Sequence, residues 1–123
     1  MLINKRKIIR FFCKPKLDKE ALEAYFHKLP SEIDINWFRD GKYIIGKIEA
    51  DGYKFMTQAV SAKEFVEMVN DALFTVYKIP EDYFDALEKR RFYPTKEQFE
   101  KLNDASVKKS QANFIKEVEL ARV

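Results

Sequence analysis

Hydrophobic and polar residues alternate along three consecutive stretches between residues 33 and 59, a period typical of β-strands with one buried face. The residues that share a face in each stretch are Ile33, Ile35 and Trp37, then Ile44, Gly46 and Ile48, then Tyr53, Phe55 and Thr57. Two Asp-Gly pairs, Asp40-Gly41 and Asp51-Gly52, separate the stretches. Asp-Gly between apolar runs favours a tight hairpin turn, because glycine accepts a positive φ without strain. The pattern predicts a three-stranded antiparallel meander.

A helical pattern follows the meander. Ser61 and Glu64 have the spacing of a capping box, in which the serine accepts a backbone N–H bond and the glutamate reaches back. Apolar residues then recur at helical spacing, and the helix is expected to bury Phe65, Val69, Ala72, Leu73 and Val76. The polar positions expected at its surface are Glu67, Asn70 and Asp71. We expect this helix to lie across the meander.

The flanking segments carry further helix signals. Asp18 is a predicted N-cap for a helix that ends at Pro30, and Pro80 opens a predicted helix that runs to about Lys89. Thr95 and Gln98 form another capping box. A last helical segment is expected from Ser110, burying Phe114, Ile115 and Val118. Residues 5–14 fit either a strand or a short helix.

These elements predict an α+β fold. A three-stranded antiparallel meander packs on a helix and is followed by a helical C-terminal tail, and a fourth strand from the N-terminus is an open alternative. The expected parts are a basic N-terminal extension at residues 1–32, the meander and its helix at residues 33–79, and the tail at residues 80–123.

Composition narrows the class of protein. The chain has 123 residues, is 46% hydrophobic and holds one cysteine, Cys13, so we expect a folded domain without a disulfide or a cysteine zinc site. No apolar run reaches the roughly 18 residues of a membrane span, and the N-terminus lacks the long apolar stretch of a signal peptide. The sequence therefore predicts a cytoplasmic protein without membrane contact.

Catalytic signatures are sparse. His27 is the one histidine, which leaves too few ligands for zinc and no recognisable catalytic partner, so no cofactor and no metal are expected. A divalent-metal nuclease using Asp34, Asp40, Glu49 and Asp51 is a minor alternative. Strand aromatics that stack single-stranded bases, such as Trp37, are another. The absence of nucleotide-loop and nucleophile motifs favours a binding protein over an enzyme.

Charge is distributed unevenly along the chain. Residues 1–30 carry 8 basic and 3 acidic side chains, residues 31–88 carry 6 and 12, and residues 89–123 carry 9 and 5. An acidic middle between two basic ends suits either a basic protein partner or nucleic acid, and it also suits plain solubility.

Residues 41–73, "GKYIIGKIEADGYKFMTQAVSAKEFVEMVNDAL", resemble the HicB-like antitoxin domain in their order of hairpin, third strand, polar turn with Gln58, and capped helix ending in "DAL". This resemblance implies a partial ribonuclease H-like fold without its catalysis. It also implies that the protein binds and silences a small basic RNase toxin. The acidic residues expected to meet that toxin are Asp34, Glu49, Asp51, Glu67 and Asp71.

The C-terminal run "RRFYPTKEQFEKLNDASVKKSQANFIKEVEL" resembles a ribbon-helix-helix unit, with a short strand before two helices. This resemblance implies DNA-binding autoregulation and a homo-oligomer, with Arg90 and Arg91 beside the ribbon and Ser110 meeting phosphate near the second helix. The alternative function is a nucleic-acid-binding regulator without a toxin partner. It would use the basic ends, at Lys5, Arg6, Lys7, Arg10, Arg90, Arg91, Lys108 and Lys109.

Overall fold

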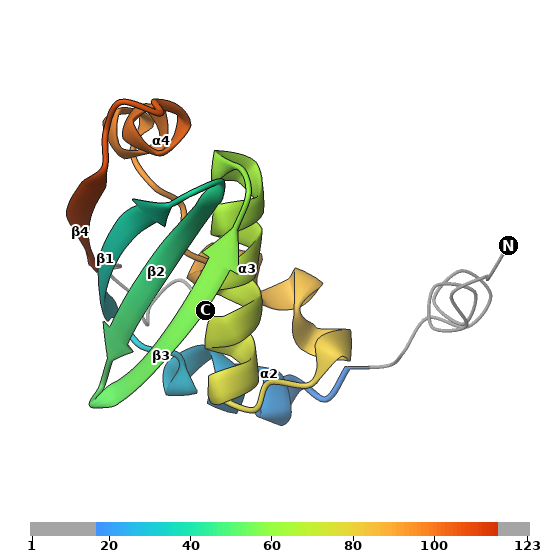
Figure 1. Cartoon of the computed structure of the whole chain (residues 1–123). Coiled ribbons are helices and arrows are strands. Elements are labelled where there is room, and N and C mark those ends of the chain that lie inside the picture. The colour runs from blue at the N-terminus through green and yellow to red at the C-terminus, as the bar shows by residue number, and fades with distance from the viewer. Residues whose placement is uncertain (1–16, 116–123) are drawn as a thin grey trace, which may run out of the picture.

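The computed structural model describes residues 17–115, which form an α+β fold built on a four-stranded antiparallel sheet (Figure 1). The strands are β1 (Glu32–Asp40), β2 (Tyr43–Ala50), β3 (Tyr53–Ala59) and β4 (Lys109–Ile115). They lie in the order β3-β2-β1-β4, so the predicted meander is confirmed. The fourth strand comes from the C-terminal side of the chain. Residues 1–16, which belong to the segment considered for that strand, lie outside the described residues.

Both hairpins close with two-residue turns. In the second, Asp51 and Gly52 have φ of 49° and 83°, as a type I′ turn requires. In the first, Asp40 pairs with Tyr43, so the central residues are Gly41 and Lys42 and the turn lies one residue later than predicted. Gly41 has φ of 61° at the first central position, which is the type II′ pattern.

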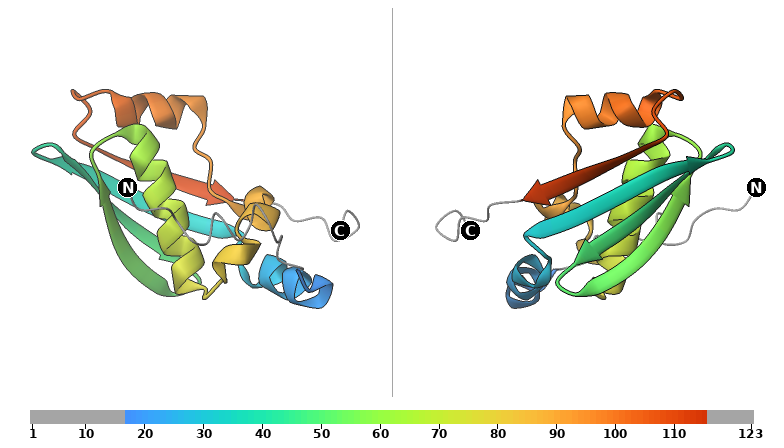
Figure 2. Two further views of the ribbon diagram at one scale, coloured as in Figure 1. Left: turned by 90° about the vertical axis from the view of Figure 1, so that its right-hand side faces the viewer. Right: turned by 60° about the vertical axis from the view of Figure 1, so that its left-hand side comes forward.

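Helix α3 (Ala62–Val76) packs against β2 and β3 and covers one face of the sheet (Figure 2). Ser61 Oγ accepts from the N–H of Glu64 at 3.1 Å, so the predicted serine cap is confirmed. Glu64 Oε1 reaches back to the N–H of Val60 at 3.0 Å, one residue before the position that a capping box uses. The chain leaves the helix two residues after Val76, at Lys78, whose φ of 57° lets Ile79 N–H reach Phe74 O at 2.9 Å. This 6→1 bond is the Schellman arrangement with lysine in place of the usual glycine.

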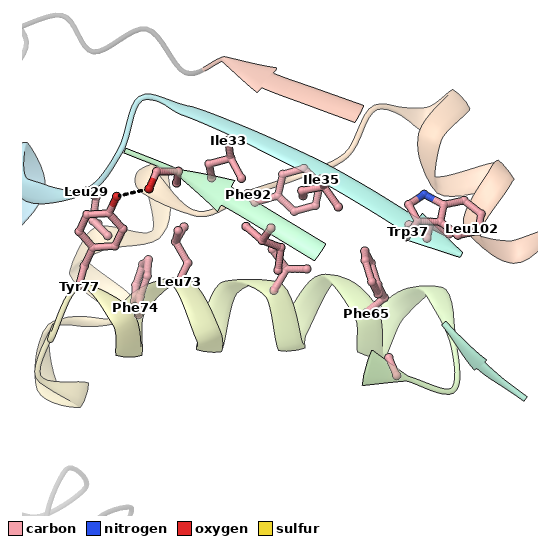
Figure 3. Close-up of a cluster of buried hydrophobic side chains, with 14 of the residues drawn as sticks. Leu29, Ile33, Ile35, Trp37, Phe65, Leu73, Phe74, Tyr77, Phe92 and Leu102 are labelled. Atoms are coloured by element: carbon pink, nitrogen blue, oxygen red, sulfur yellow. Dashed lines mark hydrogen bonds between the residues drawn. The ribbon is translucent and has the colours of Figure 1, made fainter. Parts of the chain in front are cut away.

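The core lies between α3 and the inner face of the sheet. Figure 3 shows Phe65 and Leu73 pointing from α3 toward the sheet, with Ile33 and Ile35 on the opposing strand. These four side chains are at most 1% exposed. The face of β1 that the sequence predicted to be buried, with Ile33, Ile35 and Trp37, is therefore the buried one, because residues two apart on a strand share a face.

Two shorter helices flank this core. Helix α2 (Lys19–Lys28) starts where predicted, since Asp18 Oδ1 accepts from the N–H groups of Glu20 and Ala21 at 2.8 and 3.2 Å. Helix α4 (Lys96–Asn103) opens with the predicted capping box of Thr95 and Gln98. Residues 80–115 thus contribute a helix and β4 to the same fold as the meander.

The segment after Pro80 is not the predicted α-helix. It forms two 3₁₀ helices, η1 (Glu81–Tyr83) and η2 (Asp85–Arg90), with non-helical dihedrals at Leu87. The kinked path buries Leu87 completely and places the ring of Phe84 4.9 Å from that of Phe74. Full burial of Leu87, which contributes about 1.5–3 kcal/mol, and partial burial of Phe84 favour this path over a regular helix.

The predicted helix from Ser110 is wrong, because this segment is strand β4. Its outward residues alternate with Ala112, which is buried, and Phe114, which is half-buried, and this two-residue period suits a strand. Pairing with β1 satisfies backbone groups on β1 that β2 does not reach. Ile115 is 66% exposed instead of buried, and Val118 lies outside the described residues.

Asn70 was expected at the surface of α3, but it is 6% exposed. Its Oδ1 accepts from the N–H of Phe92 at 2.6 Å, and its Nδ2 donates to Phe92 O at 2.9 Å. The amide thereby holds both polar backbone groups of Phe92, whose ring is buried and packs edge-on to Phe114 at 5.1 Å. Asn70 thus links α3 to the segment that leads into α4.

Asn70→Ala is expected to lower the free energy of unfolding by about 2 kcal/mol, because it leaves both buried backbone groups of Phe92 without a partner. Urea denaturation followed by circular dichroism measures this difference. The exposed neighbour variant Asp71→Ala is the control and is expected to change stability by less than about 0.5 kcal/mol. Equal stability of the two variants would contradict the assigned role of Asn70.

Candidate partner-binding site

The face of the sheet opposite α3 is covered by none of the helices described between residues 17 and 115 (Figure 2). We call this the open face. The strand register places cross-strand neighbours there in rows, one of which joins Met56, Lys47, Asn36 and Gln111. The next row toward the β2–β3 turn joins Lys54, Glu49, Asp34 and Asn113.

Four carboxylates gather at the end of the open face near the β2–β3 turn. We call this group, Glu32, Asp34, Glu49 and Asp51, the acidic end. It lines a shallow hollow of about 300 Å³ together with Ala50 and Gly52. Asp34 and Glu49 are directly paired across β1 and β2. Two strands and one hairpin turn therefore bring the side chains together.

Neutral donors hold three of these carboxylates in place. Asn113 Nδ2 donates to Glu32 Oε2 at 2.9 Å and to Asp34 Oδ1 at 2.5 Å. Tyr77 donates its hydroxyl to Asp51 Oδ2 at 3.0 Å. Burial and the bond to Asp51 raise the pKa of Tyr77 above its usual value, so the hydroxyl keeps its proton and remains a donor at neutral pH.

Few positively charged side chains in the described part of the chain lie close to the carboxylates of the acidic end. Among residues 17–115, the one lysine or arginine within ion-pair range of these carboxylates is Lys54, whose Nζ lies 3.9 Å from Glu49 Oε2. Both side chains are largely exposed, and exposed pairs of this kind contribute little. The described residues contain no group of three or more carboxylate, histidine or cysteine ligands placed to hold a metal ion. The acidic end is thus an anionic surface held in place by uncharged donors.

The five acidic residues expected to meet a toxin are only partly brought together. Asp34, Glu49 and Asp51 lie at the acidic end, whereas Glu67 and Asp71 are exposed on α3, on the other side of the sheet. Sequence reasoning missed Glu32 and the positioning role of Asn113. Only the pairing of β4 with β1 brings Asn113 beside Asp34, and that pairing leaves no local signal.

Arg90 does not lie at the surface, so its expected position beside a DNA-binding ribbon is wrong. It is 4% exposed, and its guanidinium donates to the carbonyls of Phe26, Leu29 and Pro30 at 3.0, 2.5 and 3.3 Å. Burial lowers the pKa of this guanidinium from its usual value. The side chain caps the C-terminus of α2, where carbonyl groups lack helical partners.

The other expected nucleic-acid residues are scattered. Arg91 is half-buried with its guanidinium over the ring of Phe74, 5.8 Å from the centroid. Lys108 donates to Ala105 O, and Lys109 and Ser110 lie on β4. Residues 91–95 form no strand and the segment from Ser110 forms no helix, so the expected ribbon-helix-helix order is absent from residues 90–115. Lys5, Arg6, Lys7 and Arg10 lie outside the described residues.

The aromatic residues considered for base stacking are divided between the two faces. Trp37 is 4% exposed and belongs to the core, with Arg39 above its ring at 5.4 Å. Phe38 is half-buried and lines a second hollow of about 430 Å³ with Lys47 and Lys109, among others.

No protein-family model, curated protein or solved structure matches this chain. The HicB-like resemblance of residues 41–73 therefore stays a prediction. As for membranes, the helices found between residues 17 and 115 are all too short or too polar to cross one.

Proposed function

We propose that this protein is an antitoxin-like binding protein that masks a small basic RNase toxin at the acidic end of its sheet. The observation that carries this proposal is the convergence of four carboxylates on one hollow, with a single lysine within ion-pair range among the described residues. The class of partner, a small basic RNase toxin, is suggested by the resemblance of residues 41–73 to the HicB-like domain. No catalytic step is assigned to this chain.

The chemistry of the acidic end suits a cationic protein. Carboxylates accept paired hydrogen bonds from arginine, and an uncompensated anionic patch speeds association with a basic partner. Because Asn113 and Tyr77 already hold three of the carboxylates, binding would cost little side-chain ordering.

The partner can be sought by purifying the tagged full-length chain from its native cells with nuclease treatment. A small basic protein in near-stoichiometric amount is expected. That protein should cleave RNA when separated, and adding back the chain should stop cleavage. A captured protein without RNase activity, or cleavage that the chain leaves unchanged, would contradict the antitoxin function.

The double variant Asp34→Asn/Glu49→Gln is expected to weaken binding of this partner by about 10-fold or more at low salt, mainly through slower association. Surface plasmon resonance on the purified pair measures both rates. The matched control, Glu67→Gln/Asp71→Asn, removes the same charge from α3 and is expected to bind nearly as well as wild type. If both double variants weaken binding equally, the acidic end is not the contact surface.

One observation favours a second candidate function, nucleic-acid binding. Lys47 Nζ lies over the ring of Phe38 at 5.8 Å and Lys109 is the cross-strand neighbour of Phe38, so a base that displaced Lys47 from the ring would find two lysines near its phosphates. Labelled single-stranded RNA and duplex DNA should then bind with an affinity that falls steeply as salt rises. Binding that is undetectable at low salt removes this candidate.

A further inference from the structure

The two edges of the sheet, β3 and β4, differ in their side chains. Strand β3 forms one edge, and within residues 17–115 no strand pairs with its outer side. Ala50 and Tyr53 flank a two-residue turn and therefore form a hydrogen-bonded pair. From Tyr53 onward, every second residue of β3 forms backbone hydrogen bonds with β2. The residues between them, Lys54, Met56 and Gln58, therefore point their backbone N–H and C=O groups away from the sheet.

The side chains along this edge are unusually apolar for a surface. Tyr53 is 51% exposed, Met56 is 60% exposed, and Val60, directly after the strand, is 53% exposed. The opposite edge, β4, has the polar residues Lys109, Gln111 and Asn113 at its outward positions, and the exposed apolar residue Ile115 lies at the last position of the strand. Polar and charged residues protect an edge strand from pairing, whereas an apolar edge invites it. Lys54 places one charge on β3, but the middle outward residue is Met56, so β3 is the less protected edge.

We propose that β3 pairs antiparallel with β3 of a second copy of this chain about a two-fold axis at Met56, extending the sheet across both copies. Such a contact is isologous, because the same surface is used on each copy. It would pair the outward backbone groups of Lys54, Met56 and Gln58 and cover the exposed side chain of Met56. The proposal does not rest on the proposed function, because it is argued from the backbone and side chains of β3 alone.

The sequence of β3 is self-complementary in this register. With the axis at Met56, Lys54 faces Gln58 of the second copy, and Phe55 faces its Thr57. No like charges are opposed. An axis at Lys54 would instead place two ammonium groups directly opposite each other, which is destabilising, and an axis at Gln58 would overlap only the strand ends. This complementarity favours a second copy over an unrelated strand.

Sedimentation equilibrium of the full-length chain, with a reducing agent to keep Cys13 free, tests the proposal. The wild type is expected to reach twice its chain mass of 14.6 kDa as concentration rises. Gln58→Lys should raise the dimer Kd by roughly 10-fold, because the two-fold axis creates two Lys–Lys pairs. Gln58→Glu, which faces Lys54 instead, should keep or lower the Kd.

Gln111→Lys places the same charge on the outer edge of β4 and should leave the Kd unchanged. Circular dichroism melting confirms that each variant is folded, since Gln58 and Gln111 are both exposed. A wild type that stays monomeric at all concentrations overturns the proposal. So does a Kd that changes equally with either charge at position 58, or one that responds to Gln111→Lys instead.

Discussion

Replacing Arg90 with alanine is expected to lower the free energy of unfolding by about 4 kcal/mol, the largest single effect predicted for this fold. The guanidinium is 4% exposed and donates to three carbonyls at the end of α2. It also lies over the ring of Phe26 at 5.1 Å. Alanine would leave the carbonyls of Leu29 and Pro30, two buried residues, without this donor, and would open a void between α2 and η2.

Urea denaturation measures this loss, and the single tryptophan, Trp37, is a built-in fluorescence probe because it is 4% exposed. Arg90→Lys keeps the charge but cannot spread its donors over three carbonyls, so it should recover only part of the stability. Arg91→Ala is the matched control, with an expected loss of about 1 kcal/mol from the contact with Phe74. Equal losses in Arg90→Ala and Arg91→Ala would contradict the capping role of Arg90.

The second large effect is expected at Gly46, where β2 passes directly beneath the ring of Phe65. A Cβ at this position would lie 2.7 Å from both Cε1 and Cζ of that ring. Phe65 is 1% exposed, so the ring has no free space to move into. Gly46→Ala is therefore expected to lower the free energy of unfolding by about 3 kcal/mol through overpacking.

A double-mutant cycle separates this clash from a general intolerance of β2 to substitution. In a Phe65→Leu background the atoms nearest to the new Cβ are gone, so Gly46→Ala should then cost less than about 1 kcal/mol. Thermal and urea unfolding of the four proteins provide the cycle. Additive losses in the double variant would show that the ring is not what excludes a side chain at Gly46.

Local signals predicted the elements whose determinants lie close together in the chain. The Asp51-Gly52 turn fixes the register of β2 and β3 through backbone dihedrals that few other residues accept. Ser61 and Thr95 cap their helices through bonds to residues three positions ahead. The same locality explains why three of the five expected acidic residues, Asp34, Glu49 and Asp51, lie together, since adjacent strands and the turn after them carry them.

Long-range contacts account for what the sequence did not reveal. Asn70 is buried by a bond to Phe92, 22 residues away, and Arg90 by bonds to a helix end some 60 residues earlier. β4 carries an apolar pattern compatible with either a helix or a strand, and the open edge of β1 decides between them. Asn113 lies beside Glu32 and Asp34 only because this segment forms a strand paired with β1, so neither Glu32 nor Asn113 could be assigned to the candidate site from local sequence.

The position of β4 in the chain also has a consequence for protein synthesis. Asp34 and Asn113 are neighbours in the finished sheet, yet they are 79 residues apart in sequence. At about 5–20 residues per second, the ribosome adds the later residue roughly 4–16 seconds after the earlier one. The meander and α3 therefore emerge while the outer edge of β1 still lacks its partner strand. In the nascent chain, the strand that becomes central in the finished protein is for that interval an open edge.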